Sequence, residues 1–172
     1  RYEISNFALP GHASRHNRVY WSGAGWWAFG LGATSAPWGE RLARPRTREA
    51  YGLWLQEQHR RGPDRSLVQA TASTLSLEDR LLVGLRRHEG VDLIRHAACC
   101  GWSSADCRRW LPLLEQRWEP FRQNGLMQCH GSRWRLTDPL GMAVSNAVLV
   151  ELVAWWEDVS ADVAHPASSA GR

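Results

Sequence analysis

The stretch SRHNRVYW, residues 14–21, brings together an imidazole, a carboxamide and two aromatic rings, contributed by His16, Asn17, Tyr20 and Trp21. A neutral imidazole is a common metal ligand, and aromatic rings stack on flat molecules. These residues could therefore hold a planar ligand, with His16 as the axial donor to a metal at its centre. The structural alternative is that His16 is a hydrogen-bonded residue in a corner rich in tryptophan.

A second candidate follows in GLGATS, residues 30–35, where an apolar run over residues 26–31 ends. Gly30, Gly32 and Ala33 are small enough to let a ligand or another backbone approach closely. The segment lacks the glycine spacing of a Rossmann or phosphate-binding loop. The segment therefore indicates close packing at this point, by either a ligand or another stretch of backbone.

The cysteines are the remaining candidate ligands, and the chain has four: Cys99, Cys100, Cys107 and Cys129. No two of them form a CxxC pair, and their spacing fits neither a zinc site nor the CxxxCxxC loop of an iron–sulfur cluster. Cys99 and Cys100 lie in an apolar helical stretch, where cysteine packs as a small hydrophobic residue. This inventory is typical of a reduced, intracellular protein, and we expect a cytoplasmic location.

Composition limits the class of protein. The 172 residues are 44% hydrophobic and 22% charged, which indicates a globular chain. All 21 basic residues are arginine, and the net charge of +4 is too small and too dispersed to require a nucleic acid. No apolar run approaches the ~20 residues of a membrane span, and no secretory segment is recognisable.

The elements predicted for the first half of the chain are two strands and a helix. Residues 2–7, YEISNF, alternate and predict one strand, and residues 26–31 predict a second that is buried on both faces. Glu3 on the first strand is expected to point to solvent, with the inside of a barrel as the alternative. A helix is predicted over residues 47–61, and the polar residues 62–74 form a connector that holds the domain boundary.

The second half predicts helix, helix, helix, hairpin and helix around one core, which is the order of a winged-helix-like domain. A capping box starts the third helix at Ser103 and Asp106. A kink or break is expected near each proline of that helix, Pro112 and Pro120. Its apolar stripe consists of Leu111, Leu114, Trp118 and Phe121.

The chain then closes with a hairpin and a last helix. The hairpin is expected around residues 130–132, and Asp138 is expected to cap the last helix, with Pro139 at its first position. Val148 of that helix should face the apolar stripe of the third helix. Residues 158–172 are small and polar, and they predict a disordered tail.

The chain resembles the HemW family of radical S-adenosylmethionine proteins, which are related to the oxygen-independent coproporphyrinogen III oxidases, over nearly all of residues 1–157. The family pattern runs YEISNFA, PG, HNxxYW and then a strand end GxGxAxS. The second half is similar to the family's C-terminal domain in EDRLLVGLRRHEGVDL, RLTDPLG and SNAVLVEL. The positions that match the first pattern, in order and nearly in spacing, are residues 2–8, Pro10, Gly11, His16, Asn17, Tyr20, Trp21, Gly30, Gly32, Ala33 and Ser35.

The resemblance implies an α+β chain in two parts. Residues 1–61 would be the C-terminal end of a (β/α) radical S-adenosylmethionine partial barrel, and residues 62–74 a linker. Residues 75–157 would form the mostly helical, winged-helix-like C-terminal domain of the family, followed by the tail over residues 158–172.

The resemblance also implies site residues. In the family, HNxxYW is associated with haem binding, and its histidine with ligating the iron. The residues at these positions are His16, Asn17, Tyr20 and Trp21. In the related oxidases the strand end borders the S-adenosylmethionine pocket, and the corresponding residues are Gly32, Ala33 and Thr34. Thr34 departs from the histidine that is usual in HemW members.

The family's three-cysteine loop, which holds its 4Fe–4S cluster, does not occur in this sequence. The chain alone is therefore expected to be inactive in radical chemistry. It would be either a piece of a longer protein or a degenerate remnant, and we expect the former. HNxxYW favours the haem-chaperone branch of the family over the oxidase branch. The implied ligand is haem or a porphyrin, and the implied partners are haem-accepting proteins.

The alternative from another class is a winged-helix module that binds nucleic acid, with residues 103–124 in the major groove. The arginines placed to contact phosphates would be Arg108, Arg109, Arg117 and Arg122. The same helix carries Asp106, Glu115 and Glu119, which would repel DNA. We therefore expect no nucleic-acid partner.

Overall fold

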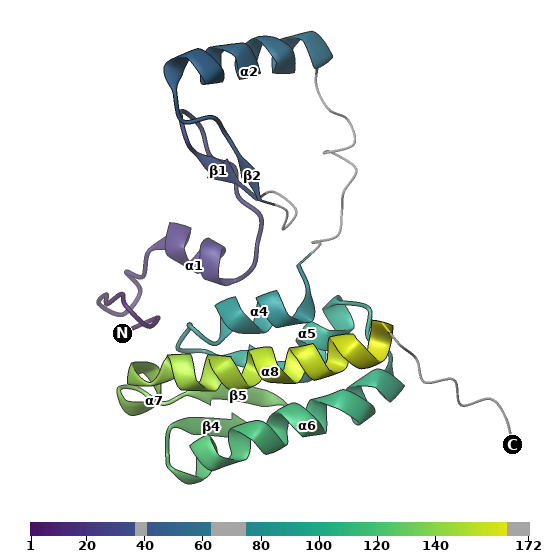
Figure 1. The fold of residues 1–172 in the computed structure, drawn as a ribbon. Helices are drawn as coiled ribbons and strands as arrows, with labels where there is room; N and C mark the ends of the chain where they lie inside the picture. Colours follow the sequence, from purple (N-terminus) through teal and green to yellow (C-terminus); the bar gives the residue numbers. More distant parts are fainter. Residues whose placement is uncertain (37–40, 63–74, 165–172) are drawn as a thin grey trace, which may run out of the picture. The chain divides into compact units, whose positions relative to one another are not determined.

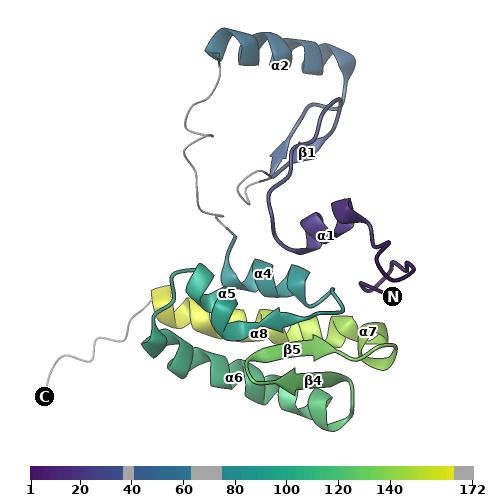
Figure 2. The same cartoon turned by 180° about the vertical axis from the view of Figure 1, so that it is seen from behind.

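The computed structural model describes residues 1–36, 41–62 and 75–164. It is a mixed α+β chain, as predicted, with two compact units (Figures 1 and 2). Ser14–Leu75 form one, here called the ribbon unit, and Arg1–Ala13 with Ser76–Arg172 form the other, here called the helical unit.

These units differ from the predicted domains at the N-terminus. Residues 1–13 pack with the second half of the chain, whereas the sequence placed them with the rest of residues 1–61. Most of the predicted linker, residues 63–74, lies outside the described residues.

The ribbon unit contains α1 (Arg15–Trp21), β1 (Thr34–Ser35), β2 (Leu42–Ala43) and α2 (Arg48–Arg61). α2 confirms the helix predicted over residues 47–61. Thr47 caps it by accepting a hydrogen bond from the Ala50 amide at 3.2 Å, which satisfies one of the free donors of the first turn. Gly62 ends it with a φ of 72°, a conformation that glycine adopts without strain.

The strand predicted over residues 26–31 is not formed. β1 and β2 make a two-stranded antiparallel ribbon instead, and Trp26 meets Ala36 only in an isolated bridge. The Ser35 hydroxyl bonds to the amide and the carbonyl of Ala28 in place of a backbone ladder, and Gly30 and Gly32, with φ values of 97° and 66°, turn the chain at the end of the segment.

The helical unit has eight described elements, of which three strands form a sheet and five are helices (Figure 1). They are α4 (Leu77–Gly84), β3 (Val91–Asp92), α5 (Leu93–Cys99), α6 (Ser104–Gln123), β4 (Met127–His130), β5 (Arg133–Leu136), α7 (Leu140–Ala143) and α8 (Ser145–Ala164). The sheet is antiparallel in the order β3-β5-β4, which confirms the predicted hairpin between β4 and β5. α6 and α8 lie side by side in both views.

The core of the helical unit lies where its long helices meet the sheet. The indole Nε1 of Trp118 on α6 donates to the carbonyl of Val148 on α8 at 3.4 Å, which confirms the predicted meeting of these helices. The Trp118 ring also packs against Trp134 of β5, with centroids 5.6 Å apart. The other buried apolar side chains are Leu77, Leu81, Leu85, Val91, Leu93, Ala97, Trp110, Leu111, Leu114, Met127, Leu136, Met142, Leu152, Trp155 and Val159.

α6 begins as predicted, and of the predicted kink or break at its prolines the break does not occur. Ser103 Oγ accepts from the Asp106 amide at 3.1 Å, and the Asp106 carboxylate accepts from the Ser103 amide at 2.9 Å, which is a complete capping box. The helix then runs without a break through Pro112 and Pro120. Burial of its apolar face outweighs the ~3 kcal/mol that an interior proline costs.

The end of the chain also differs from the prediction. Pro139, and not Asp138, is the cap residue of α7, since the Asp138 carboxylate forms an ion pair with Arg1 at 3.4 Å. α8 continues to Ala164, so the first seven residues of the predicted tail are helical. Residues 165–172 lie outside the described residues. None of the described helices has the length and apolarity to span a bilayer.

The N-terminal residues 2–7 do not form the predicted strand. Glu3 makes a single bridge with Arg87, and the Ile4 amide donates to the Arg86 carbonyl at 3.0 Å. Glu3 was expected to face solvent, but its side chain is fully buried. This expectation was wrong because the segment that covers Glu3 comes from more than eighty residues further along the chain.

Candidate functional site

α1 carries all four residues of the HNxxYW motif. Ser14 Oγ accepts from the Asn17 amide at 3.3 Å and caps the helix. His16 and Tyr20 lie one turn apart and therefore share a face. His16 is exposed, whereas Tyr20 and Trp21 are half-buried. The imidazole is thus open to a ligand, on a helix whose aromatic residues are anchored.

An aromatic cluster does this anchoring. The Tyr20 ring lies edge-on to Trp21 and tilted against Trp26, with 4.7 Å between centroids in each pair. Trp26 Nε1 donates to the Thr34 carbonyl at 3.0 Å, so the cluster ends on β1. Aromatic pairs of this kind contribute about 0.5–1.5 kcal/mol beyond their burial. The cluster therefore ties the HNxxYW helix to the GLGATS strand end, and the structure brings the two predicted sites together.

The strand end at residues 32–34 packs against residues 44–46 of the same unit. The Gly32 amide donates to the Pro45 carbonyl at 2.9 Å, and the Ala33 carbonyl accepts from the Arg44 amide at 2.9 Å. A Cβ at Gly32 would lie 3.4 Å from Cγ of Arg46. The backbone and side chain that lie close to Gly32 therefore belong to the ribbon unit itself. The assignment of residues 32–34 to an S-adenosylmethionine pocket stays a prediction.

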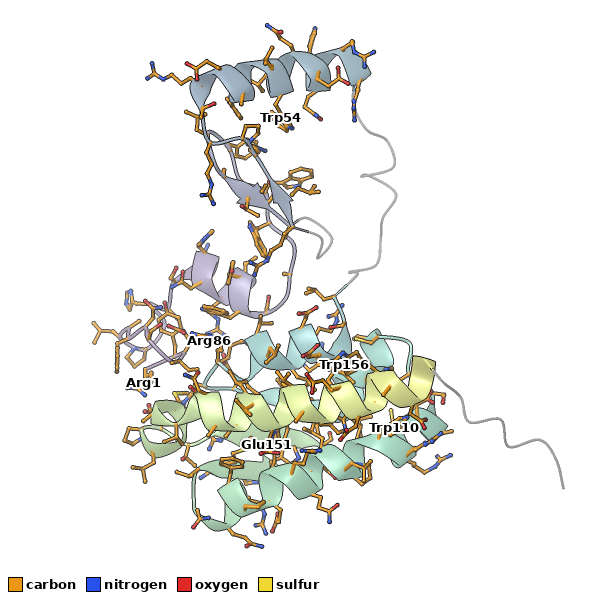
Figure 3. The ribbon with its side chains drawn as sticks, viewed as in Figure 1. Arg1, Trp54, Arg86, Trp110, Glu151 and Trp156 are labelled. Atoms are coloured by element: carbon orange, nitrogen blue, oxygen red, sulfur yellow. The ribbon has the colours of Figure 1, made fainter. Side chains whose placement is uncertain are left out.

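A pocket of about 470 Å³ lies between the ribbon and α2. Trp54 reaches into it from α2 (Figure 3). The Arg44 guanidinium lies over two rings, 5.3 Å from the centroid of Phe29 and 5.4 Å from that of Trp54. Arg41 Nη2 donates to the Tyr20 hydroxyl at 3.5 Å. The pocket lining consists of Trp27, Ser35, Arg41, Leu42, Ala43, Arg44, Trp54 and Gln58.

Sequence reasoning missed the part that Trp26 and Arg41 play in this site. The apolar pattern assigned Trp26 to a buried strand, and nothing local links Arg41 to Tyr20, because 21 positions separate them. Only the folding of the ribbon back over α1 brings them into contact.

No cluster of metal ligands accompanies the site. Within residues 1–36, 41–62 and 75–164, no three His, Cys, Asp or Glu side chains are grouped so that they could hold a metal ion. The four cysteines form no disulfide and lie on α5, at its C-cap, on α6 and on β4. Burial raises the pKa of Cys100 and of Cys129, which disfavours the thiolate that an iron–sulfur cluster needs. These residues do not fit a 4Fe–4S cluster, and His16 is left as the candidate ligand to a single iron.

Comparison with known proteins gives consistent relatives. The chain is 33% identical to the haem chaperone HemW of Synechocystis over 167 residues, which is 91% of this chain and 40% of that protein. It is 30% identical to HemW of Mycobacterium tuberculosis over 157 residues, 88% of this chain and 34% of that protein. A mitochondrial radical S-adenosyl methionine domain-containing protein of Danio rerio is 35% identical over 97 residues, 53% of this chain and 22% of that protein.

The chain thus spans less than half the length of these relatives. No protein-family model matches it, and no solved structure matches it significantly.

Proposed function

This chain is a HemW-type C-terminal portion, and we propose that it binds haem as part of a haem chaperone of the radical S-adenosylmethionine class. The whole protein would act in haem and porphyrin metabolism in the cytoplasm and pass haem to acceptor proteins. The chaperone role is favoured over the oxidase role because the relatives that cover most of the chain are named haem chaperones.

The observation that carries the proposal is the exposed His16 on the aromatic-anchored α1. In this proposal His16 offers a ring nitrogen to the haem iron. Tyr20 and Trp21 present ring surface to the porphyrin, and Asn17 completes the motif on the adjacent face of the helix. Haem is the cargo here, so these residues hold it and do not transform it.

The remaining assignments follow from the same family. Gly32, Ala33 and Thr34 would border S-adenosylmethionine in the whole protein, whose 4Fe–4S cluster would be held by residues outside this chain. Residues 1–61 would complete a (β/α) barrel and residues 75–157 a winged-helix-like domain. The order α4, β3, α5, α6, β4, β5 supports that second assignment.

The nucleic-acid alternative is disfavoured by the charges on α6. Arg109 pairs with Asp162 at 2.8 Å, and Arg122 pairs with Glu119 at 2.5 Å. Arg117 bridges two carboxylates of α8, at 3.1 and 2.8 Å. Three of the four arginines predicted to contact phosphates thus lie beside carboxylates of their own unit, which lowers the net positive charge of this face.

Titration of hemin into the 172-residue chain tests the proposal through the Soret band. The unmodified chain should bind hemin with a shifted Soret band, and His16→Ala should lose that shift and weaken binding. His59→Ala is the matched control, because it removes an exposed histidine of α2 in the same unit. Equal spectra for His16→Ala and the unmodified chain, or equal losses in both variants, would refute the assignment.

A further inference from the structure

The pocket between the ribbon and α2 has a positive charge that no described residue of its lining balances. Two guanidinium groups, of Arg41 and Arg44, line it, and none of its described lining residues is acidic. Among the described residues neither arginine forms an ion pair with a carboxylate. By contrast, Arg60 and Arg61 of α2 both pair with Glu57, at 2.8 and 2.6 Å, and lower its pKa to about 2.

Both arginines are nevertheless held in place. The Arg44 guanidinium lies over the Phe29 ring and over the Trp54 ring, and Arg41 Nη2 donates to the Tyr20 hydroxyl. Aromatic faces and a neutral hydroxyl orient a guanidinium without neutralising it. The forked donors of a guanidinium match the two oxygens of a carboxylate, and such charge-assisted pairs are the strong ones. The charge and the rings of the pocket therefore suit a carboxylate on a molecule that also has a flat apolar body.

The pocket, with the positive charge of Arg41 and Arg44, lies close to the proposed haem site on α1. Arg41 contacts Tyr20, which lies one helical turn, about 5.4 Å, along α1 from His16. A ligand whose iron sits at His16 would thus have arginine within the reach of its own periphery. Haem carries two propionate carboxylates at its edge.

We propose that Arg41 and Arg44 bind the propionate carboxylates of haem, so that the chain recognises the acidic edge of the porphyrin as well as its iron. This inference rests on the proposed haem binding at His16. It makes the pocket, with its walls of Trp27 and Trp54, the specificity-determining part of the site.

The test compares hemin with hemin dimethyl ester, which has the same iron and ring but no carboxylates. In the full 172-residue chain, the double variant Arg41→Gln/Arg44→Gln should bind hemin roughly 10- to 100-fold more weakly. It should bind the diester as the unmodified chain does, and the Soret position should be retained because His16 is intact. The double variant Arg48→Gln/Arg95→Gln removes the same charge from exposed positions outside the pocket and should leave both affinities unchanged.

Each outcome is informative. Unchanged hemin binding in the Arg41/Arg44 variant, or an equal loss for hemin and diester, would overturn the carboxylate assignment while the His16→Ala result decides the proposed function separately. S-adenosylmethionine also carries a carboxylate, so a loss of its binding without a loss of hemin binding would assign the pocket to that ligand instead. A chain that binds neither porphyrin would overturn both proposals.

Discussion

His96 contributes to the pH dependence of the stability of the helical unit. It lies half-buried on α5, and burial lowers its pKa, with Arg80 acting in the same direction and Asp92 opposing. The folded state therefore binds a proton less readily than the unfolded state. Stability from this residue is fully present above the ordinary histidine pKa of about 6.5 and is lost as pH falls towards the lower folded-state pKa.

Urea unfolding of the chain at about pH 7.5 and about pH 5 measures this effect. The unmodified chain should lose unfolding free energy on acidification, and His96→Gln should lose less, because glutamine does not titrate. Cys99→Ala, an exposed change on the same helix, should lose as much as the unmodified chain. If His96→Gln and the unmodified chain respond equally to pH, His96 is not the group responsible.

The environment of a residue could not be predicted where its neighbours in space lie far away in the sequence. His16 was singled out from its immediate neighbours, and its exposure agrees with a ligand-binding role. Glu3 was misplaced because its cover is the segment at Arg86 and Arg87. Ser5 and Asn6 donate to one of its carboxylate oxygens, so burial of Glu3 depends on local bonds and a distant cover together.

At the scale of elements, the boundaries set by local hydrogen bonds were predictable. Thr47 and Ser103 each accept from an amide three residues on, so short-range sequence suffices to locate the start of α2 and of α6. The continuity of α6 through Pro112 was not predictable in this way. It depends on burial of Leu111 and Leu114 against elements that the sequence does not place.

The α6–α8 contact should be the most costly part of the helical unit to disrupt. Trp118→Ala removes a fully buried ring, its packing on Trp134 and its hydrogen bond to Val148. The expected loss in unfolding free energy is about 3–5 kcal/mol, measured by urea denaturation. Leu113→Ala on the same helix truncates a side chain that is 44% exposed and should cost about 1 kcal/mol or less. Similar losses in the two variants would mean that this contact is not the core of the unit.

At the scale of the whole molecule, the sequence predicted the α+β class of the fold and the relatives. The resemblance to HemW rested on ordered motifs, and the Synechocystis relative agrees with it over 91% of the chain. The grouping of residues 1–13 with the helical unit is a long-range packing result. Hydrophobic periodicity cannot supply it, because periodicity tells which face of an element is buried but not against which partner.

The whole chain should also fail to assemble a 4Fe–4S cluster, even though its relatives include a radical S-adenosyl methionine domain protein. A cube needs three thiolates at one place, whereas no three potential metal ligands are grouped among the described residues, and burial raises the pKa of two of the four cysteines. Anaerobic incubation with iron, sulfide and S-adenosylmethionine should therefore give neither cluster absorption nor 5′-deoxyadenosine. A variant with all four cysteines replaced by serine controls for iron held non-specifically and should behave identically. Cluster absorption in the unmodified chain that disappears in the serine variant would show that Cys99, Cys100, Cys107 and Cys129 can converge. In that case the separation of cysteines described for this fold would not hold in solution.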